Sequence, residues 1–162
     1  MTERELEYAW FFRTEFPSVL RTVFLILRDL GRAEDIAQDA FMQLYTHWRK
    51  VSRYERPEAW VRRIAIRMAL RQQKRERMRT VLERAAVGPA LDRATDPDLA
   101  EAMKSLSPTQ RAIVVLYYYE DRPTAEIVEI LGMSQSTVRV HLSRARRHLA
   151  ELLREEVPGD VG

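Results

Sequence analysis

The sequence contains no cysteine and very little glycine, and both absences exclude kinds of chemistry. Without cysteine there are neither disulfides nor thiolate metal ligands, which agrees with a reducing cytosol. Glycine occurs at only five of 162 positions, and no glycine-rich phosphate-binding loop is present. The histidines, His47, His141 and His148, are too scattered to form a metal site. We therefore expect no enzyme, no metal and no cofactor.

Long apolar runs are also absent from the sequence. The apolar stretch Phe24–Leu27 is far too short to cross a bilayer. The first seven residues are charged and contain no apolar signal segment. These features predict a cytoplasmic protein with no membrane span.

The alternation of apolar and polar residues that marks β-strands is missing as well, and helical spacing prevails. In the first half, the spacing predicts helices over about residues 5–28, 33–48 and 58–74, with Gly31 ending the first and Pro57 beginning the third. Trp10, Trp48 and Trp60 are expected to anchor the core of this half.

The second half follows a break in the apolar pattern. Residues 80–97 contain Gly88, Pro89 and Pro97, and they predict a flexible linker. Short helices are expected over about 99–106 and 109–120. Eleven of fourteen aromatic residues lie in the first sixty positions, so each half must build its own core. The predicted fold class is all-α, with two small helical domains at residues 1–79 and 98–157, the linker at 80–97 and a frayed tail at 158–162.

Residues 123–148 carry the most informative pattern, a short helix, a turn at Gly132 and an arginine-rich helix. Pro123 is expected at the first position of the short helix, and Ser134 or Ser136 at the cap of the second. The second helix has one apolar stripe, formed by Val138, Leu142, Ala145 and Leu149. No acidic residue occurs between Ser136 and Leu149. One face can pack against the domain while the other meets a polyanion, which predicts a DNA-reading helix-turn-helix.

In a recognition helix the N-terminal end points into the major groove. The residues placed to meet base edges are Gln135, Ser136, Arg139, Val140 and Ser143. Arg144, Arg146 and Arg147 lie further along and are expected to meet phosphates. The alternative is an ordinary amphipathic helix with a solvated arginine face.

A second basic patch lies on the predicted third helix. From Arg62 to Arg79 there are eight Lys or Arg and one acid, Glu76. Arg63, Arg67, Arg71 and Lys74 share one arc, opposite an apolar side formed by Val61, Ile64, Ala65, Met68 and Ala69. Such a face can contact phosphates or single-stranded bases, or it can serve solubility alone.

Acidic side chains gather on the predicted second helix. Asp35, Gln38 and Asp39 lie close together and away from the stripe of Ile36 and Ala40. No nucleophile or histidine has a spacing that would support acid–base catalysis here. Stabilisation of the helix dipole by Glu34 and Asp35, and contact with a protein partner, both remain open.

Together these segments resemble the extracytoplasmic-function (ECF) sigma factors of bacterial RNA polymerase over nearly the whole chain. Residues 33–41 resemble the region 2 helix that docks on the clamp helices of the β′ subunit. Residues 59–65 resemble the segment that leads to −10 recognition. The opening of region 4 is resembled by residues 106–112 and 118–120, and its −35 helix is resembled by residues 137–139 and 142–145.

The resemblance implies roles that spacing alone does not supply. Core polymerase would be bound by Asp35, Gln38, Asp39 and Phe41, and the −10 element by Trp60, Arg63, Arg67, Arg71 and Lys74. The −35 element would be bound by Gln135, Ser136, Arg139, Val140, Ser143, Arg144 and Arg147. Residues 106–119 would dock on the β flap, and an anti-sigma factor is a possible further partner.

The sequence departs from the family pattern at several sites. The family usually has Asn and Asp at the positions of Arg67 and Arg71, so phosphate contact is expected there instead. Val140 and His141 replace a usual Ser-Arg pair, and Val140 could meet a thymine methyl group. One alternative is a stand-alone LuxR-type helix-turn-helix regulator, because residues 138–142 also resemble the recognition helix of that group. Another is an adaptor protein that keeps only the fold.

Overall fold

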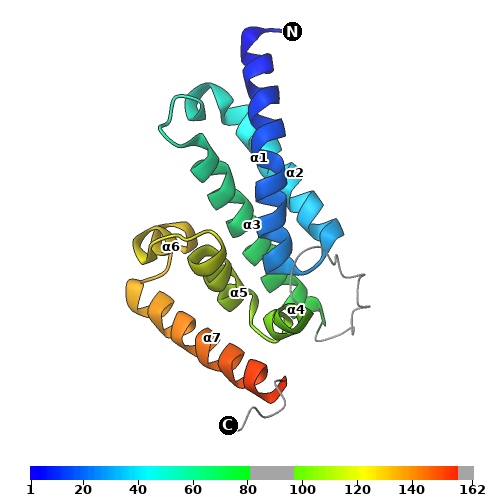
Figure 1. Cartoon of the computed structure of the whole chain (residues 1–162). Helices are drawn as coiled ribbons and strands as arrows, with labels where there is room; N and C mark the ends of the chain where they lie inside the picture. Colours follow the sequence, from blue (N-terminus) through cyan, green and yellow to red (C-terminus); the bar gives the residue numbers. More distant parts are fainter. Residues whose placement is uncertain (81–96, 157–162) are drawn as a thin grey trace. The chain divides into compact units, whose positions relative to one another are not determined.

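The structure is a computed structural model that describes residues 1–80 and 97–156 (Figure 1). The chain divides into two compact units, residues 1–89 and 90–162, which we describe separately. The described residues form helices and no strand, so the predicted all-α fold class is confirmed. None of the described helices is long and apolar enough to span a bilayer. The predicted linker, apart from its end residues, and the predicted tail lie outside the described residues.

The first unit contains helices α1 (Glu3–Leu27), α2 (Leu30–Val51) and α3 (Pro57–Thr80), each of which packs against the other two (Figure 1). Its core includes Val19 and Val23 of α1, Phe41 and Leu44 of α2, and Val61, Ala65 and Ala69 of α3. Ile64 and Met68 are half-buried against this core, which confirms the predicted apolar side of α3. Of the three tryptophans, Trp48 is buried and Trp60 half-buried, but Trp10 is 70% exposed and is not a core anchor.

The break between α1 and α2 comes earlier than Gly31. Arg28 ends α1 in the left-handed conformation (φ 60°), and its N–H donates to the carbonyl of Phe24. Asp29 then caps α2, because its carboxylate accepts from the N–H of Arg32 at 3.1 Å. Gly31 lies inside the first turn of α2. Cap formation by Asp29, and not the freedom of a glycine, therefore sets this boundary.

Tyr8 ties α1 to the middle of α2. Its hydroxyl donates to the carbonyl of Phe41 at 2.6 Å. Its ring meets Tyr45 and Trp48 edge-on, with centroid distances of 5.0 and 5.4 Å. Burial, and secondarily the neighbouring Tyr45, raises the pKa of Tyr8 to about 12. The neutral phenol is thus the form that the fold favours.

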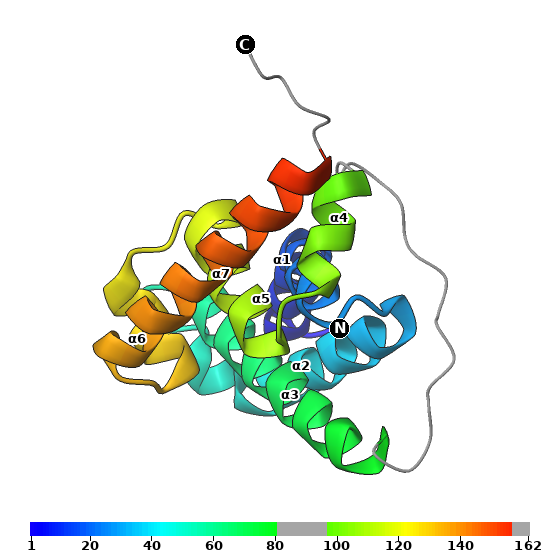
Figure 2. The same ribbon diagram turned by 90° about the horizontal axis from the view of Figure 1, so that it is seen from below.

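The second unit contains α4 (Pro97–Lys104), α5 (Pro108–Val114), α6 (Thr124–Leu131) and α7 (Gln135–Glu156), with a π-helical turn, η1 (Val115–Tyr119), after α5. Helices α4, α5 and α6 all pack against α7 (Figure 2). Ser107 and Gln110 form a reciprocal capping box at the start of α5. The helix expected over 109–120 does not stay α-helical: the N–H of Glu120 donates to the carbonyl of Val115, five residues back.

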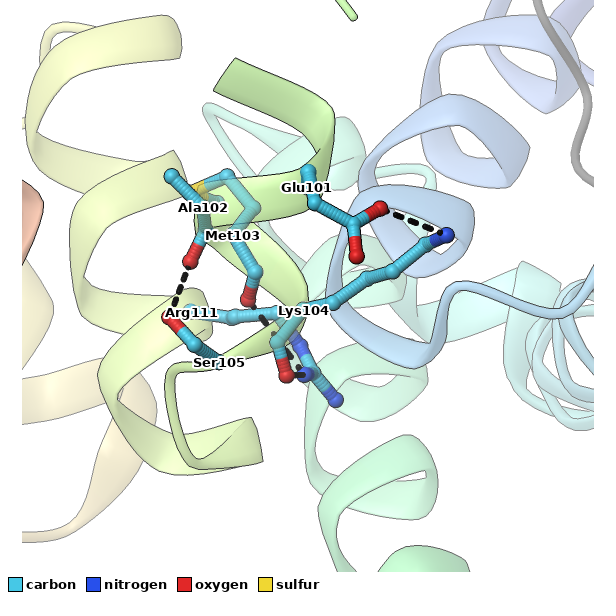
Figure 3. Close-up of polar contacts among 6 residues, drawn as sticks. All are labelled: Glu101, Ala102, Met103, Lys104, Ser105 and Arg111. Atoms are coloured by element: carbon cyan, nitrogen blue, oxygen red, sulfur yellow. Dashed lines mark hydrogen bonds and ion pairs between the residues drawn. The ribbon is translucent and has the colours of Figure 1, made fainter. Parts of the chain in front are cut away.

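Arg111 is the central polar group of the second unit (Figure 3). Its side chain is 6% exposed, and its Nη1 donates to the carbonyls of Leu106 at 2.9 Å, Lys104 at 3.4 Å and Met103 at 3.5 Å. These carbonyls end α4 and form the turn into α5; that of Met103 also accepts from the N–H of Leu106 at 3.2 Å. One guanidinium therefore satisfies the end of α4 and fixes the angle at which α5 leaves it.

We expect Arg111→Ala to destabilise the second unit by about 3 kcal/mol, because the carbonyls of Lys104 and Leu106 lose this donor. Arg111→Lys should recover only part of this loss, because an ammonium cannot reproduce the guanidinium fork. Hydrogen exchange measures the effect: amides of α4 and α5 should exchange faster, while those of α2 keep their rates as an internal control. Unchanged exchange in α4 and α5 would contradict this role.

We expect Tyr8→Phe to lower the free energy of unfolding by about 1 kcal/mol at neutral pH, the usual value of one hydrogen bond. Because the pKa of Tyr8 is raised from 10.0 to about 12 by folding, this stabilisation is complete below the lower value and is lost as the pH rises toward the higher one. Urea unfolding of both proteins at increasing pH checks this: their difference should shrink as the solution becomes strongly alkaline. A difference that stays constant would be inconsistent with a half-buried, hydrogen-bonded phenol.

Candidate functional site

The helix-turn-helix forms as predicted, except at its first residue. Pro123 is not the first residue of α6 but the cap before it, with an extended backbone (φ −66°, ψ 152°). Its carbonyl accepts from the N–H groups of Glu126 and Ile127. A proline is tolerated there because the cap residue supplies a carbonyl to the helix and needs no N–H of its own.

The turn between α6 and α7 is formed by a glycine and a serine, as the sequence predicted. Gly132 ends α6 in the left-handed conformation (φ 66°) with its N–H on the carbonyl of Val128. Ser134, and not Ser136, caps α7, because its Oγ accepts from the N–H of Thr137 at 3.2 Å. The two helices are thereby joined by a short turn that sets how α7 leaves α6.

Helix α7 has the two faces that its sequence predicts. Val138, Leu142 and Ala145 are buried and Leu149 is half-buried. The side chains on the remaining surface are exposed, including all seven predicted −35 contacts: Gln135, Ser136, Arg139, Val140, Ser143, Arg144 and Arg147. Because acids are absent from this stretch, the exposed face is positively charged and open to a polyanion.

Arg146, which lies on the same helix, already has partners within the protein. Its Nε donates to the hydroxyl of Tyr118. Its Cζ lies 5.2 Å from the ring centroid of Tyr117 and 5.4 Å from that of Tyr118. The hydrogen bond to Tyr118 raises the pKa of the Arg146 guanidinium, so this group stays protonated and positively charged. The sequence did not reveal this cluster, because its members are 28 residues apart.

The basic side of α3 is graded in exposure along the helix. Trp60, Arg63 and Arg67 are half-buried, whereas Arg71 and Lys74 are exposed. The Trp60 ring lies beside His47, with the ring centroids 5.7 Å apart. Toward its C-terminal end α3 therefore presents a freely accessible basic surface, and at its start a partly sheltered aromatic ring.

Two further charged residues of α3 do not belong to this surface. Arg62 is buried, and its Nη2 donates to the hydroxyl of Ser18 on α1 at 2.8 Å. Glu76, the only acid in the basic run, forms an ion pair with Arg32 of α2. Its negative charge is thus partly neutralised, which leaves the neighbouring basic residues dominant.

The predicted polymerase contacts on α2 separate into two groups. Asp35, Gln38 and Asp39 are exposed on one side of the helix. Phe41 is only 1% exposed and packs against the rings of Phe11, Phe12 and Phe16, so little of its side chain reaches the surface, and its contact with polymerase stays a prediction. Phe41 orients α2 from within, because its burial turns the acidic side outward.

The structure also weakens the helix-dipole explanation of the acidic residues. Helix α2 begins at Leu30, and its first turn contains no acid. Glu34 and Asp35 therefore lie beyond the turn in which the dipole is felt. Contact with a protein partner stays a prediction for these carboxylates.

A shallow apolar groove of about 540 Å³ borders this acidic side. It runs between α1 and α2, and its lining residues are Tyr8, Ala9, Phe12, Arg13, Gln38, Phe41 and Met42. Met42 is 67% exposed at its edge and extends the apolar surface of the groove. Sequence spacing did not reveal the groove, because its two walls come from different helices.

Comparisons with known proteins agree with this geometry. Residues 11–79 match the family model for sigma-70 region 2, and residues 97–149 match that for sigma-70 region 4. The RNA polymerase sigma-E factor of Streptomyces antibioticus is 34% identical over 153 residues, which span 91% of this chain and 85% of that protein. The ECF RNA polymerase sigma factor SigL of Mycobacterium tuberculosis is 30% identical over 140 residues, spanning 78% and 77%.

A solved structure has the same fold. It contains the sigma factor RpoE from Bartonella quintana in complex with the anti-sigma factor NepR, and it matches with a TM-score of 0.71 and 25% identity over 93% of this chain and 98% of that chain. The expectation drawn from four short motifs is confirmed over both units. The chain belongs to the extracytoplasmic-function sigma factors of bacterial RNA polymerase.

Proposed function

We propose that this chain is a promoter-specificity subunit that directs core RNA polymerase to its start sites and has no enzymatic activity of its own. The observation that carries the proposal is the pairing of two family regions, residues 11–79 and 97–149, each with an exposed basic helix surface. Two separate DNA contacts are what recognition of two promoter elements requires. We assign the protein to the cytoplasm, where it would work with the polymerase.

For the second unit, we assign helix α7 to the −35 element. Gln135, Ser136, Arg139, Val140 and Ser143 would meet base edges, and Arg144 and Arg147 would meet phosphates. Support comes from their exposure and from the turn at Gly132 and Ser134, which presents the N-terminal end of α7. Residues 106–119 would contact the β flap.

For the first unit, we assign helix α3 to the −10 element. Exposed Arg71 and Lys74, with half-buried Arg63 and Arg67, would bind the DNA backbone. Trp60 would offer an aromatic ring for base stacking, and its position beside His47 supports a fixed ring orientation. The domain limits 1–79 and 98–157, with the tether at 80–97, are part of this proposal.

Core polymerase would bind on α2 through Asp35, Gln38 and Asp39. The neighbouring apolar groove gives this contact a second component, because exposed carboxylates alone supply little net affinity. A helix of the β′ clamp that carries basic side chains next to an apolar side chain would fit both the carboxylates and the groove. Because NepR, described as an anti-sigma factor, is the partner in the matching solved structure, an anti-sigma factor is also a possible partner of this chain.

The stand-alone LuxR-type regulator is not favoured. That hypothesis gives no role to residues 11–79, which match region 2. The adaptor hypothesis has no use for the acid-free, exposed face of α7.

Run-off transcription tests the function directly. Purified core polymerase is supplied with fragments of the source genome, with and without this protein. Discrete start sites that need both components are expected. If the protein binds DNA sequence-specifically by itself and no such start sites appear, the stand-alone regulator replaces this proposal.

We expect Asp39→Arg to abolish binding to core polymerase, because it reverses a charge at the centre of the proposed contact. The melting temperature should stay nearly unchanged, since Asp39 is exposed. Glu151→Arg, which makes the same charge change on an exposed site of α7, is the matched control and should bind normally. Co-elution with core polymerase measures binding; if the Asp39 variant unfolds, the residue is structural instead.

We expect Arg139→Ala to cost about 1–3 kcal/mol of promoter discrimination, the usual worth of an arginine that reads guanine. Arg144→Ala and Arg147→Ala should instead weaken binding to all sequences about equally, because phosphates carry no sequence information. Holoenzyme binding to promoter fragments with intact and scrambled −35 elements separates the two effects. An equal loss on both fragments for Arg139→Ala would remove its base-reading role.

A further inference from the structure

The cluster of Arg146, Tyr117 and Tyr118 is more than a brace between two helices. The two tyrosine rings meet edge-on, with centroids 4.9 Å apart and an interplanar angle of 77°. Arg146 lies in the corner between them, within about 6 Å of both rings, where a guanidinium is attracted to the ring faces. Its side chain is nevertheless exposed, so the charge is held in place without being covered.

The π-helical turn explains how consecutive tyrosines reach one arginine. In an α-helix, neighbouring side chains diverge strongly around the axis. In η1 the hydrogen bond from the N–H of Glu120 to the carbonyl of Val115 widens the turn, and a further bond joins Arg122 to the carbonyl of Leu116. Such π-turns are rare and often occur at functional sites. Both tyrosines of this turn lie within reach of the same guanidinium on α7.

The guanidinium of Arg146 is held by tyrosines and not by an acid. Its Nε donates to the hydroxyl of Tyr118, Tyr117 is a weaker hydrogen-bond partner, and no carboxylate of the described residues pairs with it, so a donor is left for another acceptor. Because the Tyr118 hydroxyl accepts that bond, its own proton is available for another acceptor. A guanidinium edge and a phenol proton thus lie side by side, and this is a donor pair suited to a phosphate oxygen.

The position of this donor pair along α7 fits the backbone of DNA. Arg146 follows Arg139 by seven residues, which is two helical turns, about 10 Å further along the helix and rotated by only about 20°. Arg139 lies near the end of α7 that would enter the major groove, so Arg146 lies where the groove edge and its phosphates are expected. Holding the side chain in advance removes part of the entropy cost of binding, about 0.5–1.5 kcal/mol for one side chain.

We propose that Arg146 and Tyr118 form a composite binding site for one phosphate of the DNA backbone. The phosphate accepts hydrogen bonds from an Nη group of Arg146 and from the hydroxyl of Tyr118. The site adds η1, outside the helix-turn-helix, to the DNA surface. It rests on the proposed function of α7 as the −35 helix.

The test measures the affinity of holoenzyme for a promoter fragment as a function of salt. Arg146→Ala should weaken binding about tenfold and lower the slope of log affinity against log salt by about 1, because one counterion fewer is released. Tyr118→Phe should weaken binding about threefold on intact and scrambled −35 elements alike. The double variant should bind no more weakly than Arg146→Ala alone, since the two groups serve one phosphate.

Matched controls separate this site from a structural brace and from the function of α7. Tyr45→Phe removes a hydroxyl from a tyrosine of equal exposure in the other unit, 52% against 54% for Tyr118, and should leave affinity unchanged. If Tyr118→Phe lowers the melting temperature but not the affinity, the cluster is only a brace and the inference is overturned. If Arg139→Ala weakens binding while both cluster variants do not, this inference alone fails. If none of the three variants affects DNA binding, the assignment of α7 fails with it.

Discussion

The buried guanidinium of Arg111 is the interaction on which the second unit depends. Carbonyls at the end of a helix lack the N–H partners of a continuing helix, and at the end of α4 the guanidinium of Arg111 supplies donors to them. Arg111 satisfies three carbonyls with one side chain and thereby sets the angle between α4 and α5. Both helices pack on α7, so the position of α7 in this unit depends on this contact.

In the first unit, an aromatic cluster fixes the orientation of α2. Phe41 is surrounded by rings of α1, and Tyr8 holds its carbonyl from the same side. With Phe41 turned inward, the helical period places Asp35, Gln38 and Asp39 on the outer surface. The core thus fixes the rotation of α2 about its axis, and this rotation decides which side chains a polymerase could meet.

Much of this arrangement was predictable because helices are encoded locally. The apolar stripe of Val138, Leu142 and Ala145 predicted the buried face of α7. The family followed from short motifs in the right order. The errors arose where two local signals competed: Asp29 set a boundary that Gly31 was expected to set, and Pro123 capped α6 where it was expected to begin it.

The sequence by itself determined the helices, their two-faced character and the side of α7 that carries its charge, because these depend on residues within a few positions of each other. Only the tertiary structure decided that Phe41 is buried, that Trp10 is exposed and that Arg111 is an internal cap. It alone brought Tyr118 to Arg146 across 28 residues and opened the groove between α1 and α2. Such pairings depend on how helices pack, and a periodic pattern states which face is apolar without stating what that face will meet.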